Sequence, residues 1–496
     1  MTEIEINHLF AFFSYLISIA FYGYLVVAIV FLILDNRQNS STFAWIFIFI
    51  LLPVVGLVLY LFFGKNHRII GRHRKKIHQM IGSCFPENTK RFFKNHKKML
   101  GDLTKEEPHS LEKKLMILLE KNSYSLLTDN NQVEILQNGK EKFPALIKDI
   151  QNAKKTIHLT YFIWKNDPFT KQMQEILIKK AKEGVEVRIL IDAWGSILLP
   201  QRYRIKMRKA GVKIFRYFDF RFPLTIHTIN YRNHRKIAVI DGKIGYTGGI
   251  NMGKEYLSGG KQFDFWRDTH FRVKGEAAVI LQSIFALEWE NTTKEKLNSK
   301  KYFPEIKELK NPGLKTEMQI TTSGPDSNWE SIRQMFFLMI NGAKKKIEIQ
   351  SPYFVPGESL ITALKTAALS GVEIKIMIAG MPDKKLPYWA AFTYFEELLR
   401  AGVKIYHYEK GFLHSKTISV DSKICSIGTA NFDLRSFLIN YELMAIFYDK
   451  KVTRNLESDF ENDLKECTQM TKDHYQEINP LAKFRNSVAR LFSSIL

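Results

Sequence analysis

Four blocks of sequence occur twice along this chain in the same order, so the chain contains an internal duplication. The first copies are AKKTIHLTYF from Ala153, GVEVRILID from Gly184, AGVKIFRYF from Ala210 and HRKIAVIDGKIGYTGGIN from His234. The second copies are AKKKIEIQSPYF from Ala343, GVEIKIMIA from Gly371, AGVKIYHYE from Ala401 and HSKTISVDSKICSIGTAN from His414. A period of about 180 to 190 residues predicts two similar folding units.

Each copy alternates short β-branched apolar segments with longer amphipathic ones, such as residues 171–182 and 360–369. This alternation is typical of α/β sheets with crossover helices. We therefore predict two duplicated α/β domains, residues 119–300 and 316–478, packed about a pseudo-twofold axis. A Lys/Asn-rich stretch, residues 293–315, is expected to join them.

Two long apolar runs precede the duplication. Residues 9–34 carry no charge and reach about 39 Å as a helix, enough to cross a hydrocarbon core of about 30 Å. Residues 43–63 are also uncharged, and membrane helices tolerate their Pro53 and Gly56. A signal peptide fits poorly because the leading MTEIEINH has no Lys or Arg. Two buried helices of a soluble core fit less well because the runs are apolar on all faces. We predict a transmembrane hairpin within residues 1–65.

Basic residues follow the second run and predict its orientation. They are Lys65, Arg68, Arg72, Arg74, Lys75 and Lys76. The positive-inside rule places this side, and hence both ends of the hairpin, in the cytoplasm. Residues 66–118 are interpreted as a basic juxtamembrane linker.

The chain as a whole is strongly basic, with 73 Lys and Arg against 50 Asp and Glu and a net charge of +23. This excess favours a polyanionic partner, either an anionic membrane or nucleic acid. Three distant cysteines give no disulfide framework or zinc spacing and favour a reducing compartment.

The C-terminal stretch, residues 479–496, is predicted to form an amphipathic helix. Two placements stay open for its apolar stripe: a membrane surface, or the protein's own core. The stripe consists of Leu481, Phe484, Val488, Leu491, Phe492 and Ile495.

Each copy carries a His-x-Lys-x4-Asp motif followed by a turn of small residues that ends in Asn. Because alternate residues of a strand share a face, each copy presents an imidazole and an ammonium together. A twofold arrangement would bring both pairs into one cleft. The first set is His234, Lys236, Asp241, Gly248, Gly249 and Asn251; the second is His414, Lys416, Asp421, Gly428, Thr429 and Asn431.

This set suits attack on a phosphodiester. The lysines and asparagines can bind the non-bridging oxygens and stabilise charge in the transition state. One neutral His can attack phosphorus while the other, protonated, donates to the leaving oxygen. This chemistry needs no metal and no cofactor, and the sequence has no obvious carboxylate cluster to bind a metal.

At these residues the chain resembles the phospholipase D superfamily over nearly all of residues 120–470. The resemblance implies a covalent phosphohistidine at His234, with His414 as general acid. It implies that Asp241 and Asp421, although part of the catalytic motif, orient the strand and turn. A carboxylate downstream of each motif is expected to orient the histidine of the other half. These carboxylates are Glu442 in NYEL for His234 and Asp268 in WRDTH for His414.

Other stretches are similar to bacterial cardiolipin synthases. They are TFAWIFIFILLPVVGLVLYLFFGKN from Thr42, FDFWRDTHFRVKG from Phe263, TSGPD from Thr322 and NFDLRSFLINYE from Asn431. This resemblance implies a multi-pass protein of the bacterial cell membrane with cytoplasmic catalytic domains. It would join two phosphatidylglycerol molecules into cardiolipin and glycerol.

Four other functions stay open at this point. They are a phospholipase D hydrolase, a transferase with another acceptor alcohol, a nuclease and a non-catalytic membrane adaptor. The hairpin argues against a nucleic-acid partner, and the presence of both His-Lys pairs argues against the adaptor. Oligomeric state, regulation and acyl-chain preference cannot be read from the sequence.

Overall fold

The computed structural model describes residues 3–34, 39–60, 109–219, 230–260, 262–305 and 315–491. It divides into a small unit that contains the N-terminal helices and a large unit that contains both sequence copies. Each unit is described by itself.

The described residues of the small unit form α1 (Glu3–Leu34), α2 (Asn39–Leu51) and α3 (Pro53–Leu59). The rings of Tyr24 and Phe49 lie 6.5 Å apart, so α1 and α2 are in contact. Within the described residues, one helix is long and apolar enough to cross a membrane, over Ala11–Leu34.

The second predicted span, residues 43–63, is not one continuous helix where the structure describes it. The helix breaks at Leu52, and a new helix begins at Pro53. A proline lacks the N–H of the helical hydrogen bond, and its ring clashes with the carbonyl four residues earlier. The predicted two-helix hairpin is therefore not confirmed. Residues 61–63 lie outside the described part.

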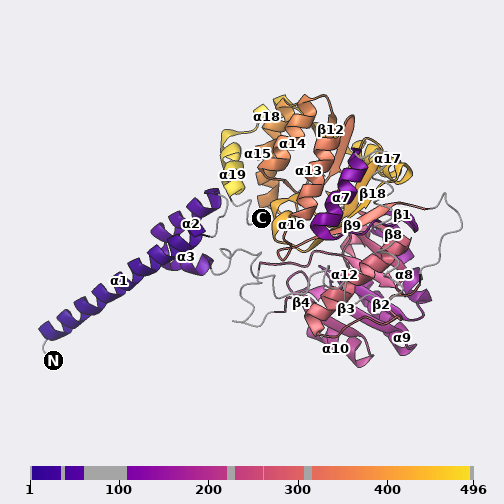
Figure 1. The fold of residues 1–496 in the computed structure, drawn as a ribbon, viewed down its shortest axis with the longest axis horizontal. Coiled ribbons are helices and arrows are strands. Elements are labelled where there is room, and N and C mark those ends of the chain that lie inside the picture. Colours follow the sequence, from indigo (N-terminus) through magenta and orange to yellow (C-terminus); the bar gives the residue numbers. More distant parts are fainter. Residues whose placement is uncertain are drawn as a thin grey trace. The chain divides into compact units, whose positions relative to one another are not determined.

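The large unit contains two mixed sheets, one from each sequence copy, that share a seven-strand topology; the second sheet has one further edge strand, β19 (Figure 1). The order of the first is β1 (Asn131–Gln137), β8 (Thr269–Gly275), β6 (Ile244–Gly248), β5 (Ile237–Ile240), β2 (Thr156–Tyr161), β3 (Glu186–Asp192) and β4 (Lys213–Tyr217). The order of the second is β19 (Cys467–Met470), β13 (Lys404–Tyr408), β12 (Glu373–Ala379), β10 (Lys346–Gln350), β15 (Thr417–Val420), β16 (Ile424–Gly428), β18 (Glu442–Phe447) and β9 (Met318–Ser323).

Strands β2, β3 and β4 run parallel, and β10, β12 and β13 repeat this arrangement in the second half. The remaining strands of each sheet are antiparallel. Two short ladders add to the sheets: β7 (Trp266–Arg267) pairs with β14 (Phe412–Leu413), and β11 (Phe354–Val355) pairs with β17 (Phe432–Asp433). The first of these ladders joins the two halves.

Helices pack on both faces of the parallel strands, which explains why both faces of β2 and β3 are buried, including polar side chains such as His158 and Arg188. The first half contains α8 (Asn138–Asn152), α9 (Pro168–Lys182), α10 (Gln201–Lys209), α11 (Glu255–Ser258) and α12 (Glu276–Thr293). The second half contains α13 (Ser331–Gly342), α14 (Glu358–Leu369), α15 (Lys385–Arg400), α16 (Leu434–Leu438), α17 (Lys450–Leu464) and α18 (Lys472–Gln476).

The antiparallel parts of the two sheets share one core. Ile237 and Phe271 of the first half pack in a cluster with Ile427 and Phe447 of the second. The rings of Phe271 and Phe447 meet edge to face at 5.2 Å. This shared apolar core holds the halves together along the antiparallel strands.

Two terminal segments also pack on the second half. Helix α7 (Leu111–Ser123) begins inside the stretch that we predicted to be a linker, and its Leu115 and Leu119 are buried in the second core. Helix α19 (Pro480–Leu491) packs on α15, where Arg485 stacks on Trp389 at 4.4 Å and Ala489 is buried. Leu481, Phe484 and Leu491 of α19 remain exposed. Residues 492–496 lie outside the described part.

Candidate active site

The backbone of each motif histidine is hydrogen-bonded to the opposite half of the duplication. The His234 N–H donates to the Tyr441 carbonyl at 3.0 Å, and the His414 N–H donates to the Arg267 carbonyl at 2.7 Å. Each histidine lies three residues before the central antiparallel strand of its sheet, β5 or β15. The amino ends of these strands pair with the carboxyl ends of β2 and β10, Ile237 with Thr160 and Thr417 with Gln350. The duplication thus builds one site from two halves.

Each histidine contacts a buried carboxylate that belongs to the opposite half. Glu442 Oε1 lies 2.9 Å from His234 Nδ1, and Asp268 Oδ2 lies 2.7 Å from His414 Nδ1. A carboxylate at Nδ1 favours the tautomer that has its proton there and leaves Nε2 free. The structure therefore places the two carboxylates against the two histidines in a crossed arrangement.

The two motif lysines are buried in the same site. Lys236 Nζ donates to the carbonyl of His234 at 2.7 Å, and Lys416 Nζ donates to that of His414. Burial lowers the pKa of Lys236 to about 7 and that of Lys416 to about 8. An ammonium held here without a counter-ion is poorly solvated, so the site favours a bound anion.

Burial also lowers the pKa of both histidines. That of His234 falls to about 4; the Glu442 charge raises it, and Lys236 and Lys416 lower it further. The pKa of His414 falls well below its usual value through burial and then through the same two lysines. A phosphodiester anion between the lysines would offset their charge and raise the pKa of both imidazoles.

The two carboxylates differ in their hydrogen bonds. Glu442 also accepts hydrogen bonds from the Thr429 hydroxyl and, at 3.2 Å, from the Asn440 amide. Burial raises its pKa, but His234, Lys236 and Thr429 outweigh burial and lower it. Asp268 accepts one from the Thr269 N–H at 2.8 Å, and burial raises its pKa to about 6. Glu442 is therefore the more firmly ionised of the two.

The small residues of the turns leave room for these carboxylates. A Cβ at Gly249 would lie 2.0 Å from Asp268 Oδ1, and one at Gly428 would lie 2.3 Å from the Leu443 carbonyl. Gly248 has a φ of 148°, which side chains rarely adopt. The equivalent of Gly249 in the second half is Thr429, whose hydroxyl reaches Glu442.

The two motif asparagines are buried beside the turns. Asn251 Oδ1 accepts the Ile163 N–H at 3.2 Å and so ties the turn to the end of β2. Asn431 Oδ1 is buried and has no hydrogen-bond partner among the described residues. A buried amide oxygen without a partner is costly, so Asn431 is available to a ligand donor or a water.

The motif aspartates lie at the opposite ends of β5 and β15 from the lysines. Asp241 accepts hydrogen bonds from the N–H groups of Lys154, Lys155 and Thr156 at 2.7 to 2.9 Å. Asp421 repeats this with residues 344–346. Both have positive φ angles in the tight turn that follows their strand. Both aspartates thus hold turns away from the motif histidines and lysines, which agrees with the orienting role that the resemblance implies for them.

Two buried arginines adjoin the site, and the motif did not reveal them. Arg235 donates to the Glu442 carbonyl and to Glu288 of α12, both at 3.0 Å. Arg267 donates to the Asp268 carbonyl and, through Nε, to Asp463 of α17, both at 2.8 Å. Each arginine thus fixes the backbone of one histidine-orienting carboxylate to a helix of the other half.

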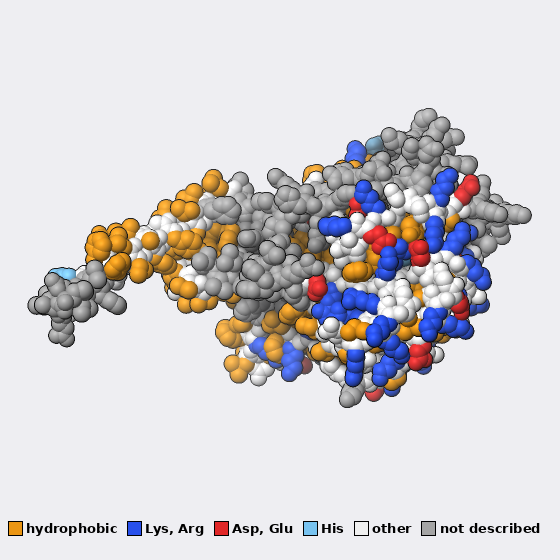
Figure 2. All heavy atoms as spheres, turned by 90° about the horizontal axis from the view of Figure 1, so that it is seen from below, with side chains coloured by type: hydrophobic (Ala, Val, Ile, Leu, Met, Phe, Trp, Pro, Cys, Tyr) orange, Lys and Arg blue, Asp and Glu red, His pale blue; other side chains and the backbone are white. Residues whose placement is uncertain are grey.

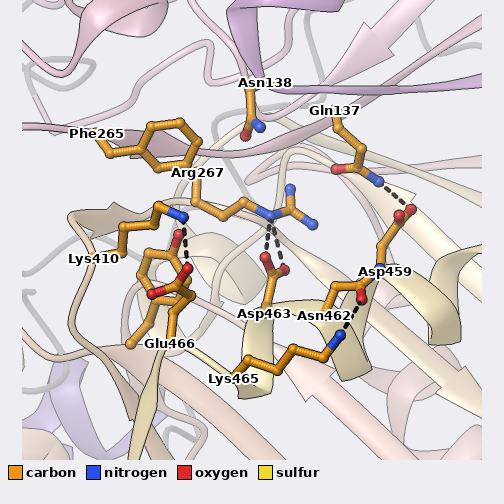
Figure 3. Close-up of a pocket in the computed structure, with 11 residues that line it drawn as sticks. Gln137, Asn138, Phe265, Arg267, Lys410, Asp459, Asn462, Asp463, Lys465 and Glu466 are labelled. Atoms are coloured by element: carbon orange, nitrogen blue, oxygen red, sulfur yellow. Dashed lines mark hydrogen bonds and ion pairs between the residues drawn. The ribbon is translucent and has the colours of Figure 1, made fainter.

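A cavity of about 310 Å³ lies beside the second of these pairs. Figure 3 shows Arg267 directed at Asp463, with Lys410 against Glu466 on one side and Gln137 against Asp459 on the other. The motif histidines and lysines are not among its lining residues. Its charged groups already have partners within the cavity lining, so it is a contact region between the halves rather than the reaction site.

An aromatic ring contacts each histidine. Phe162, at the end of β2, lies 4.9 Å from His234, and Trp266 of β7 lies 5.2 Å from His414. Two such halves, each with a His, a Lys and a carboxylate supplied across a shared site, define a protein of the phospholipase D type.

Comparisons with known proteins narrow this class. The family profile described as "Cardiolipin synthase, PLD-like domain" matches residues 146–278 and 337–464, and "Phospholipase_D-nuclease N-terminal" matches residues 24–65. The cardiolipin synthase of Oceanobacillus iheyensis is 40% identical over 486 residues, covering 97% of this chain and 99% of the relative. Major cardiolipin synthase ClsA of Bacillus subtilis strain 168 is 39% identical over 495 residues, with the same coverage. The chain belongs to the cardiolipin synthase family.

A solved structure supports the fold alone. Phosphatidylserine synthase from Haemophilus influenzae Rd KW20 aligns with a TM-score of 0.58 at 17% identity. The alignment covers 77% of this chain and 99% of that one.

Proposed function

We propose that this phosphatidyltransferase makes cardiolipin from two phosphatidylglycerol molecules through a phosphatidyl-histidine intermediate. Membership of the cardiolipin synthase family supports the reaction. The single observation that supports the mechanism is the crossed contact of His234 with Glu442 and of His414 with Asp268.

In the first step, His234 is the nucleophile. Its Nε2 lone pair attacks the phosphorus of one phosphatidylglycerol while ionised Glu442 stabilises the proton on Nδ1. The bond from phosphorus to the glycerol oxygen breaks, and His414 Nε2 donates a proton to that oxygen. Glycerol leaves, and the phosphatidyl group remains on His234. Lys236 and Lys416 bind the non-bridging oxygens, on which negative charge develops.

In the second step, the roles of the acid and the base are reversed. Neutral His414 removes a proton from the free glycerol hydroxyl of a second phosphatidylglycerol, and the resulting oxygen attacks phosphorus. The bond from phosphorus to His234 breaks, and cardiolipin leaves. Both histidines return to their starting protonation states. The same steps with water as acceptor would give phosphatidic acid, so exclusion of water decides between synthase and hydrolase.

The membrane arrangement is also part of the proposal. We infer that residues 1–65 form an integral two-span hairpin, that residues 66 onward continue on the cytoplasmic side, and that the duplicated domains act at the anionic inner leaflet. The apolar helix over Ala11–Leu34 supports one span. The basic residues after residue 64 support the orientation.

A product assay tests the reaction. Purified protein is given labelled phosphatidylglycerol in vesicles, beside His234→Ala and a control, His474→Ala, which removes an exposed histidine of α18. We expect cardiolipin and free glycerol from the parent and the control, and neither from His234→Ala. Phosphatidic acid alone would make the protein a hydrolase, and the absence of turnover would overturn the proposal.

Topology is tested separately. Single cysteines placed at residues 2, 37 and 110 of a cysteine-free variant are labelled from each side of the membrane in intact cells. We expect residues 2 and 110 to be labelled from the cytoplasm and residue 37 from outside. A shared side for residues 2 and 37 would contradict the hairpin.

A further inference from the structure

Three exposed apolar side chains gather on the loop that joins β3 to α10. The exposed fractions are 47% for Trp194, 52% for Ile197 and 89% for Leu198. The corresponding loop of the second copy, between β12 and α15, exposes a single large apolar side chain, Met381, at 38%. The duplicated fold therefore does not require such a loop.

The loop is held in place by polar contacts beneath these side chains. Asp192, which is buried, accepts the N–H groups of Trp194 at 3.0 Å and Gly195 at 2.9 Å. The Ser196 hydroxyl donates to the Phe162 carbonyl at 3.0 Å and accepts the Trp164 N–H at 2.9 Å. Ile197 and Leu198 are thus exposed on an ordered base, and the half-exposed Trp194 has the Arg232 guanidinium 4.9 Å from its ring.

The same base adjoins the nucleophile. The second oxygen of Asp192 accepts the Asn233 N–H at 2.8 Å, one residue before His234. Gly195 packs so closely on Phe162 that a Cβ there would lie 2.7 Å from the ring. Since Phe162 lies 4.9 Å from His234, the loop flanks the site at the carboxyl ends of β2 and β3.

A basic helix follows directly. Helix α10, QRYRIKMRK, contains five cationic residues and no acidic one. None of the five forms an ion pair with a carboxylate of the described residues; they are Arg202, Arg204, Lys206, Arg208 and Lys209. Figure 2 shows that Lys and Arg side chains far outnumber Asp and Glu on the face seen from below, the side on which α10 lies in Figure 1.

We propose that residues 194–198 insert into an anionic lipid bilayer and that α10 lies on its charged surface, so that the active site opens at headgroup depth. An apolar tip next to a cationic helix fits the acyl region and the anionic headgroups of one leaflet. This inference rests on the proposed function. It identifies the surface by which the large unit takes its lipid from the membrane.

Kinetics with two forms of substrate test the proposal. The variant Ile197→Asp/Leu198→Asp is compared with Leu369→Asp, a control at an exposed leucine at the carboxyl end of α14. Substrates are phosphatidylglycerol in vesicles and short-chain phosphatidylglycerol below its micelle concentration. We expect the double variant to lose at least tenfold on vesicles and less than twofold on the monomer, while the control keeps both rates.

Other outcomes are equally informative. Equal losses on both substrates would mean that the loop shapes the site, and unchanged rates on both would mean that it does not bind lipid; either overturns the proposal. If the parent turns over neither substrate, the proposed function fails instead.

Fluorescence gives a second measurement on folded protein. Tryptophan emission is recorded for the parent and for Trp194→Phe, each with vesicles that contain brominated anionic lipid. The difference between the two spectra is the emission of Trp194 alone. We expect bromine to quench this difference signal. A difference signal that bromine does not quench would place Trp194 outside the bilayer and overturn insertion.

Discussion

The two histidines differ in the carboxylate that each contacts, and this difference favours different roles for them. Glu442 accepts additional hydrogen bonds from Thr429 and Asn440, which favour its ionised form. Among the described residues, no hydroxyl donates to Asp268 as Thr429 does to Glu442, because the equivalent position, residue 249, is glycine. A firmly ionised Glu442 suits a nucleophile that must become a cationic phosphohistidine. A more easily protonated Asp268 suits a histidine that exchanges protons with the substrates.

Removal of the Thr429 hydroxyl should shift the pH at which kcat falls on the acid side of its pH profile, the acid limb. The pKa of Glu442 is lowered in the folded protein, so activity is lost as pH falls through it. Thr429→Val removes a donor to the carboxylate, so the pKa rises and the limb moves to higher pH, by about one unit. The measurement is kcat against pH. Thr429→Ser keeps the hydroxyl and should keep the limb; a shift in both variants would point to packing instead.

Arg235 should affect turnover by positioning Glu442, which contacts His234. Arg235→Lys keeps the charge but cannot reach both Glu288 and the Glu442 carbonyl, so Glu442 is less well fixed against His234. We expect kcat to fall by about ten- to a hundredfold with KM little changed. Steady-state kinetics on vesicles provide the measurement.

The control is Arg272→Lys, which alters a bidentate pair with Asp149 that touches neither orienting carboxylate. It should keep kcat. Equal losses in the two variants would indicate a general packing defect rather than positioning of Glu442.

At the scale of elements, the repeated blocks identified the strands and the alternation identified the crossover helices. The break at Pro53 and the placement of α7 were not predicted. The spacing of apolar residues in an amphipathic helix such as α7 predicts that one face is buried. It does not predict which core that face packs against. The arginine ion pairs could not be predicted from the sequence either, because Arg235 and Glu288 are 53 positions apart and contact each other only in the folded protein.

The β5–β6 hairpin gives an element-scale prediction. Asp241→Ala leaves three backbone N–H groups without their acceptor, which costs about 1 to 3 kcal/mol in free energy of unfolding. We expect a lower Tm but near-parental kcat per folded molecule, because Asp241 lies away from the site. Thermal unfolding and titration of active sites separate the two effects. A loss of kcat without a loss of stability would return Asp241 to the catalytic group.

At the scale of the whole molecule, the duplication produces one site with two inequivalent halves. The sequence motif predicted both His-Lys pairs, and the crossed contacts of the orienting carboxylates are present in the structure. The motif alone could not assign roles, since the two copies are nearly identical there. The asymmetry comes from residues outside it, above all Thr429, Asn440 and the length of Glu442 against Asp268.

This asymmetry predicts where the phosphatidyl group is trapped. In His414→Ala, a phosphatidyl ester of nitrophenol can still react, because nitrophenolate leaves without a proton from an acid. The second step then lacks its base, so the phosphatidyl group accumulates on His234 and mass spectrometry finds it on the peptide containing residue 234. In His234→Ala, no adduct should form. An adduct on His414 in the latter variant would exchange the roles of the two halves and would mean that the ionisation of Glu442 does not select the nucleophile.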